Sequence, residues 1–272
     1  MSLAYQRKKF LWRDTPNPLI QQRLGTANED EGSFVSPAHG PLYALVADHV
    51  VGGHVIFPGA GYLEMARAAL IAVTSSKGAL LKRTYFLQPL LLDEPAFTMV
   101  TVSLDTGANR FEVSSAANDQ LKVSHCAGDA STLTGTIRGV VASTIRDDTS
   151  AQAILSSDLY TALRTVGLEY GPQFKPLQAT WCSREIGVAF ATMRKRTRLE
   201  GTRIHPADLD GALQLSTLLV VNNTGEMRLP FMVAEASLIS ASGRICSVAQ
   251  RQDSDKMGVV LLGLNSIDVV LA

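Results

Sequence analysis

The sequence predicts an α+β fold in two halves, each combining a long helix with antiparallel strands. Apolar residues recur at helical spacing from Pro58 to about Ser75 and again over residues 208–221. Short runs rich in β-branched residues, separated by Gly, Asn and Asp, are typical of strands joined by hairpins. We expect such strands at residues 84–92, 97–104, 110–116, 121–127, 134–142, 176–184 and 186–195, with more towards the C-terminus.

The polar stretch around residues 143–150 is the best candidate for a boundary between the halves. Apolar periodicity weakens there, as it does in linkers. We therefore assign residues 1–145 to an N-terminal half, 146–155 to a linker and 156–272 to a C-terminal half.

Two further segments have simple local signals. A short helix is expected over residues 158–167, capped by Ser156 or Ser157 and ended by Gly167. Residues 1–40 contain prolines and an acidic, glycine-containing stretch, which predicts an extended segment with a solvent loop.

Composition excludes several classes of protein. Of the 272 residues, 46% are hydrophobic and 18% charged, and the 25 Lys and Arg balance the 25 Asp and Glu. This balance argues against nucleic acid or an anionic membrane as a partner. Cys126, Cys182 and Cys246 fit neither a disulfide framework nor a CxxC metal site. No stretch resembles a secretory signal or a membrane span. We expect a soluble, cytoplasmic protein, or one piece of a larger soluble chain.

The clearest chemical signal lies in DHVVGGHVIFPGAGYLEMARAAL, residues 48–70. Pro58 suits the first turn of a helix, and the glycines after it leave the unpaired N–H groups of that turn open to a ligand. His49 is expected on the strand that leads into this helix. Gly53 would provide a bend or a close approach for a substrate chain. The arrangement can aim a base at a substrate and indicates proton abstraction next to a carbonyl.

His49, Gly53 and Pro58 match the HxxxGxxxxP signature of dehydratase domains, and the chain resembles that family. These domains occur in polyketide synthases and animal-type fatty acid synthases. Three further segments support the resemblance, which runs from about Trp12 to the end of the chain. Residues 204–214 resemble the HPxxLDxxxQ segment, residues 167–174 are close to GxxYGPxF, and residues 229–233 resemble an LPFxW-type strand that we interpret as architectural.

Asp210 and Gln214 fall on the acidic motif of the second long helix. A separation of four places both side chains on one helix face, where the amide can hydrogen-bond the carboxyl or a substrate hydroxyl. The spacing alone is weak evidence for a catalytic role, because an Asp early in a helix is usually a surface residue that compensates the helix dipole. Asp208 is expected to be such a solvent-facing cap or first-turn charge. Apolar neighbours of Asp210 favour partial desolvation and a raised pKa.

The resemblance implies a double hotdog, two antiparallel sheets each wrapped around a long central helix. It also implies loss of water from a 3-hydroxyacyl thioester held on an acyl carrier protein. Neutral His49 would remove a proton from C2, and protonated Asp210 would donate to the departing 3-hydroxyl. The Gly59 N–H would stabilise charge on the thioester oxygen. Tyr170 and Gly171 would border the pocket.

The same acid and base would also serve other outcomes on this fold. Double-bond migration and oxa-Michael ring closure need the same pair, and a product-template-like hotdog module would need neither. The intact set of His49, Asp210 and Gln214 argues against a module without catalysis. We expect an acyl carrier protein and neighbouring polyketide synthase domains as partners, a homodimer, and no metal or organic cofactor.

The other histidines have ordinary structural interpretations. His54 is expected at the surface, His205 to hydrogen-bond the backbone at a helix start, His39 in a turn and His125 on a strand. None has neighbours at the spacing of a metal site.

Overall fold

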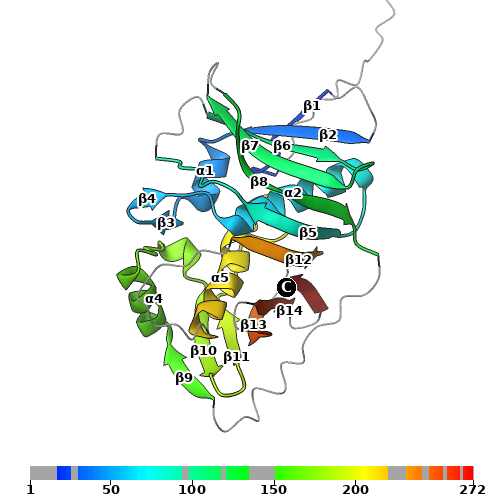
Figure 1. Ribbon diagram of the computed structural model, residues 1–272. Helices are drawn as coiled ribbons and strands as arrows, with labels where there is room; N and C mark the ends of the chain where they lie inside the picture. Colours follow the sequence, from blue (N-terminus) through cyan, green and yellow to red (C-terminus); the bar gives the residue numbers. More distant parts are fainter. Residues whose placement is uncertain are drawn as a thin grey trace, which may run out of the picture.

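The structure is a computed structural model in which residues 17–25, 30–93, 98–117, 121–134, 151–219, 231–240, 245–253, 256–263 and 266–271 are described. Figure 1 shows strands arranged around two long helices, one in each half. The α+β, double-hotdog class predicted from the sequence is confirmed.

The strands, in chain order, are β1 (Gln22–Leu24), β2 (Glu31–Pro37), β3 (Val50–Val51), β4 (His54–Val55), β5 (Ala79–Phe86), β6 (Thr98–Asp105), β7 (Arg110–Ala117), β8 (Val123–Thr132), β9 (Gln152–Leu155), β10 (Leu177–Ser183), β11 (Val188–Met193), β12 (Met232–Leu238), β13 (Ile245–Arg251), β14 (Met257–Gly263) and β15 (Ser266–Leu271). The helices are α1 (Pro41–Val46), α2 (Gly59–Thr74), α4 (Ser156–Thr165) and α5 (Pro206–Ser216), with 3-10 turns η1 (Pro172–Phe174) and η2 (Thr217–Leu219).

The two hotdog sheets are joined edge to edge. Thirteen strands form one sheet in the order β1-β2-β6-β7-β8-β5-β12-β15-β14-β13-β11-β10-β9, and β3 with β4 makes a separate hairpin. In this order, the first six strands, from β1 to β5, come from the N-terminal half. The last seven, from β12 to β9, come from the C-terminal half. The join is the antiparallel pair β5–β12, in which Leu81 faces Ala236. Pairing these two strands removes an open edge from each half.

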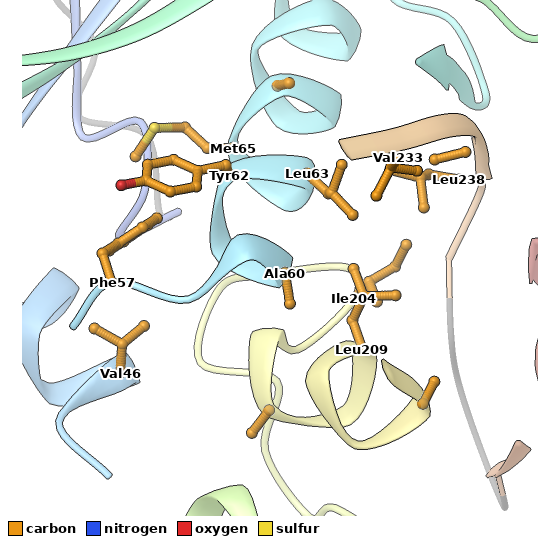
Figure 2. Packing of buried hydrophobic residues seen from close by; sticks show 14 of the residues in the cluster. Val46, Phe57, Ala60, Tyr62, Leu63, Met65, Ile204, Leu209, Val233 and Leu238 are labelled. Atoms are coloured by element: carbon orange, nitrogen blue, oxygen red, sulfur yellow. The ribbon is translucent and has the colours of Figure 1, made fainter. Parts of the chain in front are cut away.

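Each half wraps its strands around one helix. The helix α2 packs against β2, β5, β6, β7 and β8, while α5 packs against β11, β13 and β14, and the two helices also contact each other. Figure 2 shows Ala60 and Leu63 of α2 facing Ile204 and Leu209 at the start of α5, with Val233 of β12 beside them. The interface between the halves is therefore part of one continuous apolar core.

The middle of α2 is buried on every side. All residues from Ala60 to Leu70 are buried, including the charged Glu64 and Arg67. These two form a bidentate ion pair, with Nε–Oε2 at 2.5 Å and Nη2–Oε1 at 2.7 Å. Glu64 Oε1 also accepts a hydrogen bond from the Arg203 N–H at 2.9 Å. Burial of both charges is tolerated because each is paired, and the third bond links α2 to the segment leading into α5.

Several strand boundaries differ from the sequence-based expectation, and two of the differences have a clear cause. The strand expected at residues 84–92 is β5, which ends at Phe86, and Pro89 beyond it lacks the N–H that a ladder needs. Part of the expected linker at residues 146–155 is ordered sheet, because Gln152–Leu155 form β9 and pair with β10.

Helix ends differ as well. Ser156 is inside α4 rather than capping it, because its hydroxyl donates to the Gln178 carbonyl of β10. Gly167 has φ 85° and follows the helix end as expected. The helix expected over residues 208–221 begins earlier, at Pro206, and tightens into η2 at Thr217.

Some expectations concern residues outside the described ranges. These are most of the strand expected at 134–142, residues 1–16 and 26–29 of the N-terminal segment, residues 146–150 of the linker, and Leu229 with Pro230. Among the described residues, no helix is both long and apolar enough to cross a membrane.

Replacing Arg67 by methionine is expected to lower the free energy of unfolding by about 3–5 kcal/mol, because the Glu64 carboxylate would remain buried without its cation. Urea denaturation at neutral pH measures this change. The control is Lys82→Met, which removes a half-exposed ion pair with Glu235 and should cost at most about 1 kcal/mol. Equal losses in the two variants would contradict the interpretation.

Candidate active site

His49 lies in the turn after α1, directly before β3, and not on the strand expected from the sequence. The hairpin β3–β4 turns at Gly52 and Gly53, whose φ angles are 58° and 81°. Left-handed conformations at both positions of a two-residue hairpin turn favour glycine. The hairpin returns the chain so that the Ile56 N–H donates to the His49 carbonyl at 3.1 Å.

The imidazole of His49 is oriented by one short contact. Its Nδ1 lies 2.7 Å from the carbonyl oxygen of Ile56. Since a carbonyl can only accept, Nδ1 carries the hydrogen and Nε2 of the neutral ring keeps a lone pair. The ring packs against Phe174 and Tyr170, with centroids 5.3 Å and 5.5 Å away. Nε2 is therefore a base held in a fixed direction.

Asp210 lies in the second turn of α5, and Gln214 holds its carboxyl group. The Gln214 Nε2 donates to Asp210 Oδ2 at 2.8 Å and to the Phe174 carbonyl at 3.0 Å. Its Oε1 accepts from the Tyr160 hydroxyl at 3.2 Å, so the orientation of the amide is determined. Burial raises the pKa of Asp210 above its ordinary value, although His49 and the Gln214 hydrogen bond act in the opposite direction.

The two groups face each other across the interface of the halves. His49 Nε2 lies 3.9 Å from Asp210 Oδ1, and the side chains are 8% and 9% exposed. This distance is too long for a direct hydrogen bond. A hydroxyl or an activated C–H placed beside the pair could reach both atoms.

A cavity of about 290 Å³ opens at this pair, and most of the side chains around it are apolar. Its lining residues are His49, Val51, Ile56, Phe57, Gly59, Tyr62, Phe86, Leu87, Gln88, Pro89, Leu168, Tyr170, Asp210, Leu213, Gln214, Thr217 and Phe231. A mostly apolar site of this kind suits an acyl chain with one reactive polar end.

Five of the residues singled out in the sequence line this cavity: His49, Gly59, Tyr170, Asp210 and Gln214. Three others do not, and each has a local role. Gly53 makes the hairpin turn and donates its N–H to Glu169. Pro58 is the N-cap of α2. Gly171 lies so close to Asp48 that a Cβ there would meet its side chain at 2.5 Å.

The sequence did not indicate much of the apolar lining. Phe231, interpreted from the sequence as architectural, is 69% exposed and lines the cavity. Tyr160 was not singled out either, although it supports Gln214 from α4. Neither residue has a local pattern that separates it from other apolar or aromatic residues.

Asp208 is not the solvent-facing charge expected from the sequence. Its side chain is 1% exposed and pairs with Arg196. Asp208 is buried because a residue distant in the sequence pairs with it. The Arg196 guanidinium comes from the segment after β11 and neutralises the carboxylate where α5 is buried.

The remaining histidines have structural roles. His205 is the N-cap of α5, where its Nδ1 accepts the Ala207 N–H, and burial together with Arg196 lowers its pKa to about 3. His54 is exposed and pairs with Asp93 at 2.6 Å. His125 lies between the Ser115 hydroxyl and the Gln88 carbonyl. Within the part of the chain that the structure describes, no group of three or more His, Cys, Asp or Glu could hold a metal ion.

Two family models match the chain, one on each half. The model described as "Polyketide synthase dehydratase domain" matches residues 17–117, and that described as "Polyketide synthase dehydratase N-terminal domain" matches residues 140–260. Together they span well over half of the chain. The chain belongs to the polyketide synthase dehydratase family.

Individual relatives and solved structures agree with this family assignment. Polyketide synthase PksN of Bacillus subtilis (strain 168) is 27% identical over 238 residues, which cover 83% of this chain but only 4% of PksN. The dehydratase domain from the CurF module of curacin polyketide synthase has a TM-score of 0.82 at 24% identity, with 94% of this chain and 96% of that chain covered. The CurK dehydratase, solved as an inactive mutant, has a TM-score of 0.80 at 20% identity, with 94% of each chain covered. These structural similarities show a shared fold.

Replacing Asp210 by asparagine is expected to change how the stability of this dehydratase domain depends on pH. Because the folded state holds the Asp210 proton more tightly than the unfolded state, the unfolding free energy of the parent protein should fall as pH rises from about 4 through the raised pKa. Each unit of the shift corresponds to about 1.4 kcal/mol.

Urea denaturation at a series of pH values measures this dependence. The Asp210→Asn variant lacks the titrating group. Its unfolding free energy, relative to that of the parent, should therefore increase as pH rises through that range. Parallel curves for the two proteins would contradict a raised pKa at Asp210.

Proposed function

We propose that this domain removes water from a 3-hydroxyacyl thioester carried on an acyl carrier protein and releases the 2,3-enoyl thioester during polyketide assembly. The observation that carries the proposal is the opposition of His49 Nε2 and Asp210 Oδ1, 3.9 Å apart in an apolar cavity. Dehydration needs a base that takes the proton from C2 and an acid that donates to the hydroxyl on the neighbouring C3. His49 and Asp210 offer both groups within reach of one substrate.

His49 is the base in this proposal. Its Nδ1 hydrogen is committed to the Ile56 carbonyl, so Nε2 is free to take the C2 proton. As the ring becomes positively charged, the Ile56 carbonyl remains bonded to Nδ1–H and stabilises the cation. The tilted ring of Tyr170 and the edge-on ring of Phe174 restrict rotation of the imidazole.

Asp210 is the acid. Its raised pKa favours the protonated form that can donate to the leaving 3-hydroxyl. The Gln214 Nε2 hydrogen bond to Oδ2 leaves Oδ1 as the oxygen that faces His49 and the cavity. Protonation of the hydroxyl and removal of the C2 proton then occur on the same side of the substrate.

Gly59 supports the thioester oxygen. Its N–H belongs to the first turn of α2, where N–H groups have no intrahelical acceptor and the helix dipole is positive. A Cβ at Gly59 would meet the Phe86 ring at 3.1 Å, so a side chain there would crowd the cavity wall. Such a donor stabilises the enolate-like charge that develops after proton removal.

The length of the relatives supports a proposal about partners. PksN and the other relatives are much longer than this chain, which spans 4% of PksN and 8% of a squalestatin hexaketide synthase from Cochliobolus lunatus. We propose that the domain works beside other polyketide synthase domains and receives its substrate on the phosphopantetheine arm of a carrier protein. We also propose a cytoplasmic homodimer that needs no metal or organic cofactor, since thioester acidity assists proton removal.

Incubation with 3-hydroxyacyl thioesters of a carrier protein or of pantetheine tests this function, and mass spectrometry follows the loss of water. Both 3-hydroxyl stereoisomers should be offered. Absence of water loss with every isomer, in folded protein, would reject the proposal. Cyclic or rearranged products without net loss of water would favour ring closure or double-bond migration.

The variants His49→Phe and Asp210→Asn are each expected to lower the dehydration rate by roughly 10²–10⁴-fold, since each removes one proton-transfer group. Both keep the approximate shape of the side chain. Circular dichroism and thermal unfolding provide the control for folding. Full activity in either variant would remove that residue from the mechanism.

The variant Gln214→Leu is expected to move the alkaline limb of the pH–rate profile to higher pH. Activity requires protonated Asp210 and is lost as pH rises through its pKa, and the Gln214 hydrogen bond lowers that pKa. Removing the bond therefore extends the protonated form upward. The measurement is kcat at saturating substrate over a range of pH, and a limb that stays in place or moves to lower pH would contradict the assignment.

A further inference from the structure

We infer that Arg196 is a positioning residue that sets the distance between the proposed acid and base from behind the cavity. It connects Asp208, in the first turn of the helix that also carries Asp210, to the residue that precedes His49. The inference rests on the proposed function. None of the four side chains in this connection, Asp48, Gln173, Arg196 and Asp208, lines the cavity.

The first link joins Arg196 to α5. Asp208 lies two residues before Asp210, and its carboxylate receives hydrogen bonds from Arg196 Nε at 3.1 Å on both oxygens and from Nη2 at 2.8 Å on Oδ1. The side chains are 10% and 1% exposed. Buried, charge-assisted contacts of this kind have a narrow range of geometry.

The second link joins the same guanidinium to η1. Arg196 Nη1 donates to the Gln173 side-chain oxygen at 3.0 Å, and Nη2 donates to the Gln173 carbonyl at 3.3 Å. The next residue, Phe174, packs its ring against His49 and accepts a hydrogen bond from Gln214 through its carbonyl. Arg196 therefore holds a segment that contacts His49 directly and is connected to Asp210 through the Gln214 amide.

The third link crosses to the N-terminal half. The Gln173 N–H donates to Asp48 Oδ2 at 2.6 Å, and the Gly171 N–H donates to the Asp48 carbonyl at 2.7 Å. Because Gly171 has no Cβ, the segment approaches Asp48 more closely than another residue would allow. Asp48 is the residue directly before His49 in the chain, so these contacts form a continuous connection from the acid to the base.

This path can be weakened without separating the halves. The β5–β12 ladder and the bond from the Arg203 N–H to Glu64 hold them together elsewhere. Loss of Arg196 should therefore leave a folded protein in which the acid and base are less well aligned. Misplacement by about 1 Å can cost roughly 10²-fold in rate.

The test compares Arg196→Met with Arg196→Lys and with the control Glu235→Gln. Glu235 pairs with Lys82 on the surface between β12 and β5, and both side chains are 49% exposed, so the control also removes an ion pair between the halves. We expect kcat of Arg196→Met to fall roughly 10²-fold while KM stays within about threefold, since the cavity lining is intact.

The lysine variant and the control separate positioning from general damage. Lysine retains the charge but not the fork that holds Asp208 and Gln173 together, so it should recover part of kcat. The control should match the parent. A kcat of Arg196→Met within about twofold of the parent, or a loss that lies entirely in KM, would overturn the inference. If Arg196→Met does not fold, Asp208→Asn, which keeps the side-chain shape, takes its place under the same criteria.

Hydrogen–deuterium exchange gives a readout that does not depend on activity. Residues 167–174 should exchange faster in Arg196→Met than in the parent and in the Glu235→Gln control, because the Gln173 N–H bond to Asp48 is weakened. Unchanged exchange would overturn the inference. A parent protein without dehydratase activity would reject the proposed function, and the exchange experiment would still decide whether Arg196 holds this segment.

Discussion

The antiparallel contact between residues 48–52 and 167–171 is the interaction on which the site depends. Three backbone hydrogen bonds form it: the Gly52 N–H to the Gly167 carbonyl at 2.7 Å, the Glu169 N–H to the Val50 carbonyl at 2.8 Å, and the Gly171 N–H to the Asp48 carbonyl at 2.7 Å. Backbone bonds are directional and leave little freedom of register. They bring Tyr170 and Phe174 of the C-terminal half against the imidazole of His49, and both hotdogs contribute residues to the pocket wall.

The apolar surroundings tune the groups that this contact assembles. Burial raises the pKa of Asp210, and it also raises the pKa values of Tyr170, which lines the cavity, and of Tyr160, which lies behind Gln214. The tyrosines therefore keep their protons to higher pH than exposed tyrosines do, and the Tyr160 hydroxyl donates to Gln214. The same burial that makes Asp210 useful as an acid makes its charged form costly, so stability and function oppose each other at this residue.

The local patterns that predicted structure correctly are those whose cause is local. Pro58 and Pro206 mark the starts of α2 and α5 because a proline at or beside the first helical position costs no hydrogen bond. Gly167 ends α4 because its φ is positive. Asp208 was predicted wrongly as a solvent-facing charge. Its partner Arg196 belongs to another segment, and no sequence spacing indicates that the two residues pair.

The sequence by itself determined the family, the two long helices, the antiparallel strands and the residue types needed for proton transfer, because motifs and periodicity are properties of short segments. Tertiary structure alone decided that His49 Nε2 and Asp210 Oδ1 lie 3.9 Å apart, that Phe231 lines the cavity, and that the two sheets join through β5 and β12. These facts depend on contacts between residues far apart in the chain. Packing, burial and backbone pairing select those contacts only when the two halves come together.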